Sequence, residues 1–133
     1  PDAMGFRNFA SCLIEAKCSR ADLLADRKKR FRIRPELGMG DWRFFISEPG
    51  IISVEDIPPG WGLLHVVNGK VRKIHGWPQG NCCWGNPEDK PFTGNKQVEC
   101  DYMYSALRRM DLRGHLKEVY DSVIVNKSEG SAA

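Results

Sequence analysis

Apolar and polar side chains alternate along residues 11–18, and this pattern constrains the fold more than any other part of the sequence. Successive side chains of a β-strand point to opposite faces. The even-numbered positions from Cys12 to Cys18 are apolar and would share one face, whereas Glu15 and Lys17 would share the other face with Leu13. A helix would scatter these charges, so the period of two predicts a strand.

Residues 2–7 also have strand character, and Asn8 favours a turn. A tight turn at Asn8–Phe9 would pair the two strands in a register that sets Asp2 opposite Glu15. Directly opposite residues of an antiparallel pair share a face, with Cβ atoms about 4.5–5.5 Å apart. Two carboxylates this close repel each other unless a cation lies between them or they share a proton. The register therefore predicts a metal site, while the alternative for Glu-x-Lys on a strand is a solvated face of opposite charges.

A helix is expected to start where this strand ends. Ser19, followed three residues later by Asp22, resembles a capping box. The spacing predicts an apolar face made by Ala21, Leu24 and Ala25, flanked by Leu23 and Lys28.

Positive charge is concentrated close to the predicted metal site. Residues 1–40 hold nine Lys or Arg against five Asp or Glu, and six of these cations lie between positions 27 and 34. A basic helix end complements the helix dipole and is often simply solvated. Six cations in eight residues exceed what this needs, so we expect contact with a nucleic-acid backbone.

These motifs together resemble the PD-(D/E)XK nuclease superfamily, in particular its small phage- and bacteria-borne members. The resemblance covers about residues 1–76. It is carried by Pro1-Asp2, Glu15-Ala16-Lys17-Cys18-Ser19-Arg20-Ala21-Asp22, Asp26-Arg27-Lys28, Trp42-Arg43-Phe44-Phe45-Ile46 and Pro59-Gly60-Trp61-Gly62-Leu63-Leu64.

The resemblance implies a role for each matching residue. Asp2 and Glu15 would ligate Mg²⁺ or Mn²⁺ with the backbone carbonyl of Ala16, and Lys17 would orient the attacking water and stabilise charge on the phosphate. Asp22 and Asp26 would either support this site or be ordinary surface charges paired with arginines. The expected DNA-binding residues are Ser19, Arg20, Arg27, Lys28, Lys29, Arg30 and Arg32.

The same resemblance implies an α/β fold with a central mixed sheet flanked by helices, the restriction-endonuclease-like core. Members of the superfamily usually have a helix and a strand before the Pro-Asp motif, and this chain begins at Pro1. We therefore expect a fragment, or a sheet completed by a homo-oligomer or a partner chain. Residues 1–127 are expected to form a single domain and residues 128–133 a disordered tail.

The remaining sequence predicts supporting elements. Residues 41–47 are rich in strand formers, and residues 61–75 predict a hairpin with its turn at Asn68-Gly69. Residues 76–95 predict a loop. A helix is expected from about residue 101 to 110, broken near Gly114 and resuming as far as Val119.

His75, Cys82, Cys83 and Cys100 raise a zinc hypothesis, although adjacent cysteines fit the usual paired spacing poorly. Five cysteines without a disulfide pattern indicate a reducing cytoplasm. No apolar run approaches the roughly 20 residues of a membrane span, so no membrane association is expected.

The sequence thus favours a metal-dependent DNA endo- or exonuclease. The alternative is a catalytically inactive nuclease-like fold that binds nucleic acid or a partner protein, and a third possibility is a small zinc-stapled interaction module.

Overall fold

The computed structural model describes residues 1–119 and residue 121. The chain divides into two compact units, Pro1–Val98 and a second that begins at Glu99, whereas the sequence led us to expect one domain over residues 1–127. The tail predicted at residues 128–133 lies outside the described residues. The candidate sites all belong to the first unit.

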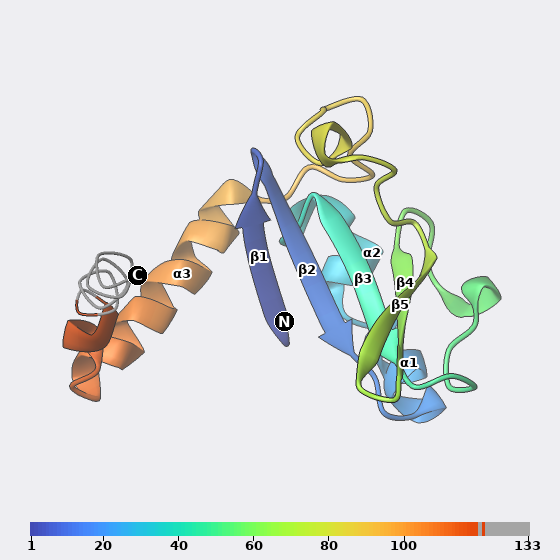
Figure 1. Ribbon diagram of the computed structural model, residues 1–133, viewed down its shortest axis with the longest axis horizontal. Coiled ribbons are helices and arrows are strands. Elements are labelled where there is room, and N and C mark those ends of the chain that lie inside the picture. Colours follow the sequence, from blue (N-terminus) through green and yellow to red (C-terminus); the bar gives the residue numbers. More distant parts are fainter. Residues whose placement is uncertain (120, 122–133) are drawn as a thin grey trace, which may run out of the picture. The chain divides into compact units, whose positions relative to one another are not determined.

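A mixed five-stranded sheet forms the centre of the first unit (Figure 1). The spatial order follows the sequence: β1 (Ala3–Arg7), β2 (Ala10–Ala16), β3 (Trp42–Ser47), β4 (Gly62–Val67) and β5 (Lys70–His75). The central pairs β2–β3 and β3–β4 are parallel, and the outer pairs are antiparallel hairpins. The predicted α/β class and mixed sheet are confirmed.

Both hairpins turn where the sequence predicted. Asn8 and Phe9 connect β1 to β2 with φ angles of 50° and 62°, and Asn68 and Gly69 connect β4 to β5 with 51° and 73°. Two successive positive φ angles define the turn whose twist matches that of the flanking strands. Arg7 pairs with Ala10, which is the register expected from the sequence.

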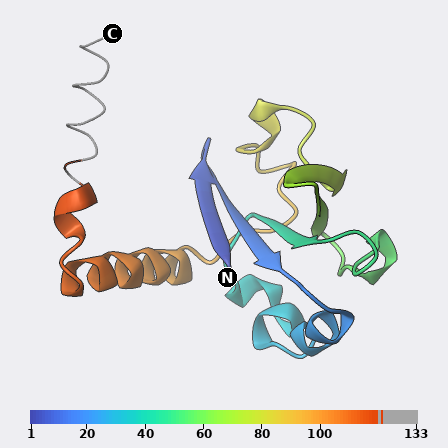
Figure 2. The same cartoon turned by 60° about the horizontal axis from the view of Figure 1, so that its bottom comes forward.

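Helices α1 (Arg20–Asp26) and α2 (Arg30–Ile33) lie on one face of the sheet (Figure 2). The core on this face includes Leu13, Leu23, Phe45, Trp61 and Leu63, all nearly inaccessible to solvent. Burial of such side chains contributes about 1.5–3 kcal/mol each to stability. This core fixes the face of β2 that carries Glu15 and Lys17.

Helix α1 buries a different face from the one predicted. Ser19 caps the helix as expected, accepting a hydrogen bond from the Asp22 backbone N–H at 3.2 Å. However, Leu23 and Asp26 are the buried residues, and Leu24 is 47% exposed. The predicted face was wrong because it was chosen from apolar residues alone, which left out Asp26. The buried face instead consists of Leu23 and, about one turn later, the carboxylate of Asp26.

The other face of the sheet is covered by the connection between β5 and the last helix. Its Trp77 and Trp84 pack on a second core around Trp42 and Phe44. The Trp42 indole N–H donates to the Trp84 carbonyl at 3.0 Å. A Cβ atom on Gly85 would lie 2.2 Å from the Asn8 carbonyl oxygen, so only glycine allows this approach to the first hairpin.

Buried Asp41 fastens the end of this connection to the sheet. Its carboxylate accepts hydrogen bonds from the backbone N–H groups of Ser11 at 3.1 Å and Gly94 at 2.8 Å. It also pairs with Lys90 and Lys96, each at 3.2 Å. Burial alone would raise the pKa of Asp41, but these hydrogen bonds outweigh it and lower the pKa.

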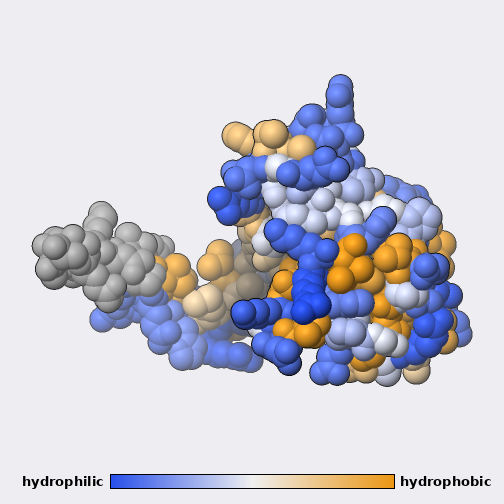
Figure 3. Space-filling view, turned by 45° about the vertical axis from the view of Figure 1, so that its right-hand side comes forward, coloured by the Kyte–Doolittle hydropathy of each residue, from blue (hydrophilic) through white to orange (hydrophobic). Residues whose placement is uncertain are grey.

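Short helical turns complete the described part of the chain. They are η1 (Pro35–Leu37), η2 (Val54–Asp56) and η3 (Asn81–Cys83). The last helix, α3 (Lys96–Leu112), begins earlier than predicted, and Gly114 ends it with a φ of 76°, as expected. On the side shown in Figure 3, apolar patches alternate with strongly polar side chains.

The first turn offers a test of the hairpin geometry. Phe9 is 96% exposed and holds a left-handed conformation, which costs an L-residue roughly 1–2 kcal/mol. We expect Phe9→Gly to raise the free energy of unfolding by about 0.5–1 kcal/mol, after the entropic cost of glycine. Urea denaturation measures the change. Phe9→Ala, which keeps the strained φ, should give no such gain, and an equal gain would contradict the strain.

Candidate functional site

The hairpin register brings Asp2 to the end of β2. Ala3 pairs with Ile14, so Asp2 is the next residue outward and faces Glu15. The Asp2 backbone N–H donates to the Ile14 carbonyl at 3.2 Å. The Asp2 carboxylate oxygen Oδ2 accepts from the Ala16 N–H at 2.8 Å. The acidic side chain is therefore held beside the Glu15-Ala16 backbone.

Glu15 and Lys17 lie on the face of β2 that Leu13 occupies, which is the helix-covered face. Lys17 is only 8% exposed. Its ammonium group Nζ lies 3.2 Å from Asp26 Oδ1 at the end of α1. The sequence therefore placed both charges on the correct face, and Leu13 on this face agrees with its being covered.

Asp26 forms ion pairs with three cations. Besides Lys17, its carboxylate pairs with Lys29 Nζ at 2.9 Å and with Arg32 Nε at 2.5 Å. Burial raises the pKa of Asp26, but the hydrogen bonds from Lys29, Arg32 and Lys17 together lower it below its usual range. The carboxylate therefore stays ionised at neutral pH and stabilises the three positive charges around it.

Arg32 links this centre to Glu15. Its Nη2 atom lies 3.4 Å from Glu15 Oε1 while its Nε contacts Asp26. The guanidinium also lies over the Trp61 ring, 4.3 Å from the centroid, and Trp61 stacks on Phe45. Arg32 is thus fixed by ion pairs on its edge and by an aromatic ring on its face.

The described residues of this site form one connected charge cluster. Four cations, including the Pro1 ammonium 3.7 Å from Glu15 Oε1, meet two carboxylates, Glu15 and Asp26, which leaves a charge of +2. Asp2 lies beside the cluster and lowers the sum to +1. Sequence reasoning identified Asp2, Glu15 and Lys17 but did not choose Asp26 as a site residue. The signal that could have found it is its spacing of three residues from Leu23 on one helix face.

A cavity of about 270 Å³ lies next to Glu15. Glu15, Lys29 and Arg32 supply its charged wall, and Leu13, Phe31 and Met39 supply apolar wall. A ligand can therefore reach one side of the charge cluster through this cavity. The acidic residues Glu15 and Asp26 therefore differ in role: the first borders open space and the second is enclosed.

The carboxylates of Asp2 and Glu15 each have partners already. Asp2 Oδ2 accepts from the Ala16 N–H, and Glu15 Oε1 lies 3.7 Å from the Pro1 ammonium and 3.4 Å from Arg32 Nη2. Magnesium prefers oxygen ligands and typically uses one or two carboxylates while keeping several waters. The carboxylates of Asp2 and Glu15 and the backbone carbonyl of Ala16 are ligands of this chemical type. No group of three or more His, Cys, Asp or Glu in the described residues is arranged to hold a metal ion.

The residues expected to bind DNA have different surroundings. Ser19 caps α1, and Arg20 forms a two-pronged ion pair with Asp56 at 2.8 and 2.9 Å. Arg27 donates to the Asp56 carbonyl, and Lys29 and Arg32 belong to the charge cluster. Lys28 and Arg30 are exposed and form no ion pair among the described residues.

The cysteines show no arrangement of a structural zinc site. All five are free thiols, and Cys82 and Cys83 are neighbours in η3. In the part of the chain that the structure describes, no helix is long and apolar enough to cross a membrane.

No family model, curated protein or solved structure matches this chain. Its functional assignment therefore depends on the residues and their geometry.

Asp26 gives a direct test of the charge cluster. Asp26→Asn would leave Lys17 and Arg32 buried without their anion, which typically costs about 3–5 kcal/mol. We expect this loss in the free energy of unfolding measured with urea at pH 7. Asp22→Asn is the matched control on the same helix, because Asp22 is exposed, and it should cost less than about 1 kcal/mol. Equal losses in the two variants would contradict the role of Asp26 as the shared ion-pair partner of Lys17, Lys29 and Arg32.

The stability difference between the wild type and Asp26→Asn should also depend on pH. The folded-state pKa of Asp26 is lowered, so its stabilising contribution is present above the ordinary carboxyl pKa of 3.8 and is lost as pH falls through the folded value. The stability gap between the wild type and Asp26→Asn should therefore be constant from pH 5 to 7 and narrow below about pH 4. A gap that widened on acidification would contradict the ion pairs.

Proposed function

We propose that this chain is a metal-dependent deoxyribonuclease that hydrolyses phosphodiester bonds. The single observation that carries the proposal is the β1–β2 register. It sets Asp2 against Glu15-Ala16, and Lys17 lies two residues further on the same face. This arrangement supplies two acidic oxygens and a nearby cation, which are the components that hydrolysis of a phosphate diester requires. The resemblance to the PD-(D/E)XK superfamily and its restriction-endonuclease-like core belongs to this proposal.

Asp2, Glu15 and the Ala16 carbonyl would hold Mg²⁺ or Mn²⁺. A bound divalent ion would polarise the phosphate and lower the pKa of the attacking water. For Glu15 to bind the ion, its Oε1 must release part of its contacts with Arg32 at 3.4 Å and with the Pro1 ammonium at 3.7 Å, both longer than the Arg32–Asp26 contact of 2.5 Å. Arg32 remains held by Asp26 and Trp61, so it would stay close enough to attract the phosphate.

Lys17 would stabilise the negative charge that develops on the phosphate in the transition state. Asp26 would act as a positioning residue, because it holds Lys17 and Arg32 without bordering the cavity beside Glu15. Exposed Lys28 and Arg30 would contact the DNA backbone. The other expected DNA-binding residues would join them only after breaking their present contacts within the protein; they are Ser19, Arg20, Arg27, Lys29 and Arg32.

A second candidate is a nuclease-like fold that binds nucleic acid without cutting it. The observation that favours it is that Glu15 and Lys17 already have partners of opposite charge, Arg32 and Asp26. Such pairs lower the affinity for a metal and occupy the ammonium group. The two candidates make opposite predictions for cleavage and the same prediction for binding.

Cleavage assays separate the two candidates. The full chain is incubated with linear, nicked, single-stranded and branched DNA in Mg²⁺ or Mn²⁺, and the products are resolved by denaturing gel electrophoresis. We expect cleavage that EDTA abolishes and that falls on the order of 10²–10³-fold in Glu15→Gln and in Lys17→Gln. Glu36→Gln is the matched control, because Glu36 is an exposed carboxylate paired with Arg34 outside the site.

Binding without metal-dependent cleavage by the intact protein would overturn the nuclease in favour of the second candidate. Cleavage that survives in Glu15→Gln and Lys17→Gln would contradict the assigned site. Absence of both binding and cleavage would overturn both candidates.

A further inference from the structure

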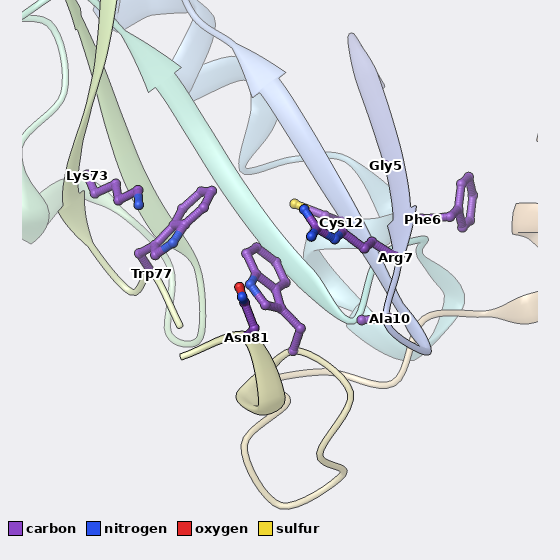
Figure 4. Close-up of a pocket in the computed structure, with 9 residues that line it drawn as sticks. Gly5, Phe6, Arg7, Ala10, Cys12, Lys73, Trp77 and Asn81 are labelled. Atoms are coloured by element: carbon purple, nitrogen blue, oxygen red, sulfur yellow. The ribbon is translucent and has the colours of Figure 1, made fainter. Parts of the chain in front are cut away.

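A second cavity, of about 410 Å³, lies on the face of the sheet opposite to Glu15 and Lys17 (Figure 4). Its polar walls come from Arg7, Lys73 and Asn81, and its aromatic walls include Trp77 and Trp84. The volume lies within the roughly 300–1,000 Å³ typical of ligand pockets. The cavity belongs entirely to the first unit of the chain.

The two tryptophans form a rigid corner. Their ring centroids are 5.1 Å apart and their planes meet at 87°. Trp84 also contacts Trp42 edge-on, and Trp77 packs against Phe44, so both indoles are anchored to the sheet. Both remain half-buried, which leaves part of each ring accessible from the cavity.

Two cations from opposite edges of the sheet border the same cavity. Lys73 of β5 lies over the Trp77 ring, with Nζ 4.6 Å from the centroid. Arg7 of β1 is exposed and lies beside Cys12 in Figure 4, while Phe6 points away. None of the described residues lining the cavity carries a carboxylate. Burial raises the pKa of the Cys12 thiol to about 11, so this wall is neutral at physiological pH.

A ligand that fits these walls needs a flat aromatic ring and an anionic group. Aromatic side chains stack with nucleobases of any sequence. The planar guanidinium of arginine matches a phosphate with two parallel hydrogen bonds, and lysine adds a point charge. The Asn81 side-chain amide can both donate and accept hydrogen bonds at a base edge.

We propose that this cavity binds a nucleotide, with the base against Trp77 and Trp84 and the phosphate between Arg7 and Lys73. The nucleotide is either free or an unpaired unit of a single strand, since both present the same base and phosphate. This site lies on the other face from the proposed metal site and needs no metal. A negative cleavage assay would therefore not overturn the nucleotide site, and the absence of nucleotide binding here would not overturn the proposed cleavage.

Nuclear magnetic resonance of the tryptophan indole N–H groups tests the site in the ¹⁵N-labelled full chain. The protein is titrated in EDTA with thymidine 5′-monophosphate, with an oligothymidylate and with inorganic phosphate. We expect saturable shifts of the Trp77 and Trp84 signals with the first two ligands. Trp61 is the internal control, because it is buried in the core on the opposite face and should not shift.

Variants then test the phosphate contacts. Arg7→Gln and Lys73→Gln each remove one charge-assisted contact, so we expect the dissociation constant to rise on the order of tenfold in each. Both side chains are exposed, so the fold should be retained. Arg72→Gln is the matched control: it removes the same charge from the neighbouring position of β5, whose side chain points to the other face.

The ligand that binds more tightly identifies the source, either a free nucleotide or a strand. Three results would overturn the site: no saturable shift of Trp77 and Trp84 with either nucleotide ligand, shifts with inorganic phosphate alone, or an unchanged dissociation constant in the Arg7→Gln/Lys73→Gln double variant.

Discussion

The ion pairs of Asp26 organise the helix-covered face of this chain. A carboxylate buried to this extent is stable only when its charge is matched, and here Lys17, Lys29 and Arg32 match it. These contacts tie α1 and the segment after it to β2. They also orient Arg32 toward Glu15 and hold it over Trp61. Loss of this one anion would therefore disturb the positions of Lys17 and Arg32 at the proposed metal site.

The motif residues that carry the family resemblance have physical roles in this arrangement. Gly60 adopts a positive φ of 84°, and a Cβ on Gly62 would come within 2.4 Å of the Phe44 ring. Trp61 between them stacks on Phe45 and supports Arg32. The Pro-Gly-Trp-Gly segment thus serves the charge cluster from a distant part of the sequence. These roles are consistent with the resemblance, and they would also arise in any chain that buried an arginine against this sheet.

Local patterns predicted the sheet well. The alternation along residues 11–18 gave the strand, Asn8 and Asn68-Gly69 gave both turns, and the register that follows places Asp2 beside Glu15. The buried face of α1 could not be predicted in this way, because a carboxylate is ordinarily counted as a surface residue. Its burial depends on Lys17 and Arg32, which tertiary packing brings to it. The tryptophan cavity was also missed, since Arg7 and Trp77 are far apart in sequence and lay in segments predicted as a plain strand and a loop.

The central functional claim is that Asp2 and Glu15 hold one divalent ion. Electron paramagnetic resonance of Mn²⁺ titrated into the full chain measures this most directly, because free and bound Mn²⁺ give different signals. We predict one bound ion per chain, with affinity lowered on the order of tenfold or more in Asp2→Asn and in Glu15→Gln, and unchanged in Asp22→Asn. Saturable binding that is equal in all four proteins, or no binding at millimolar Mn²⁺, would contradict the site.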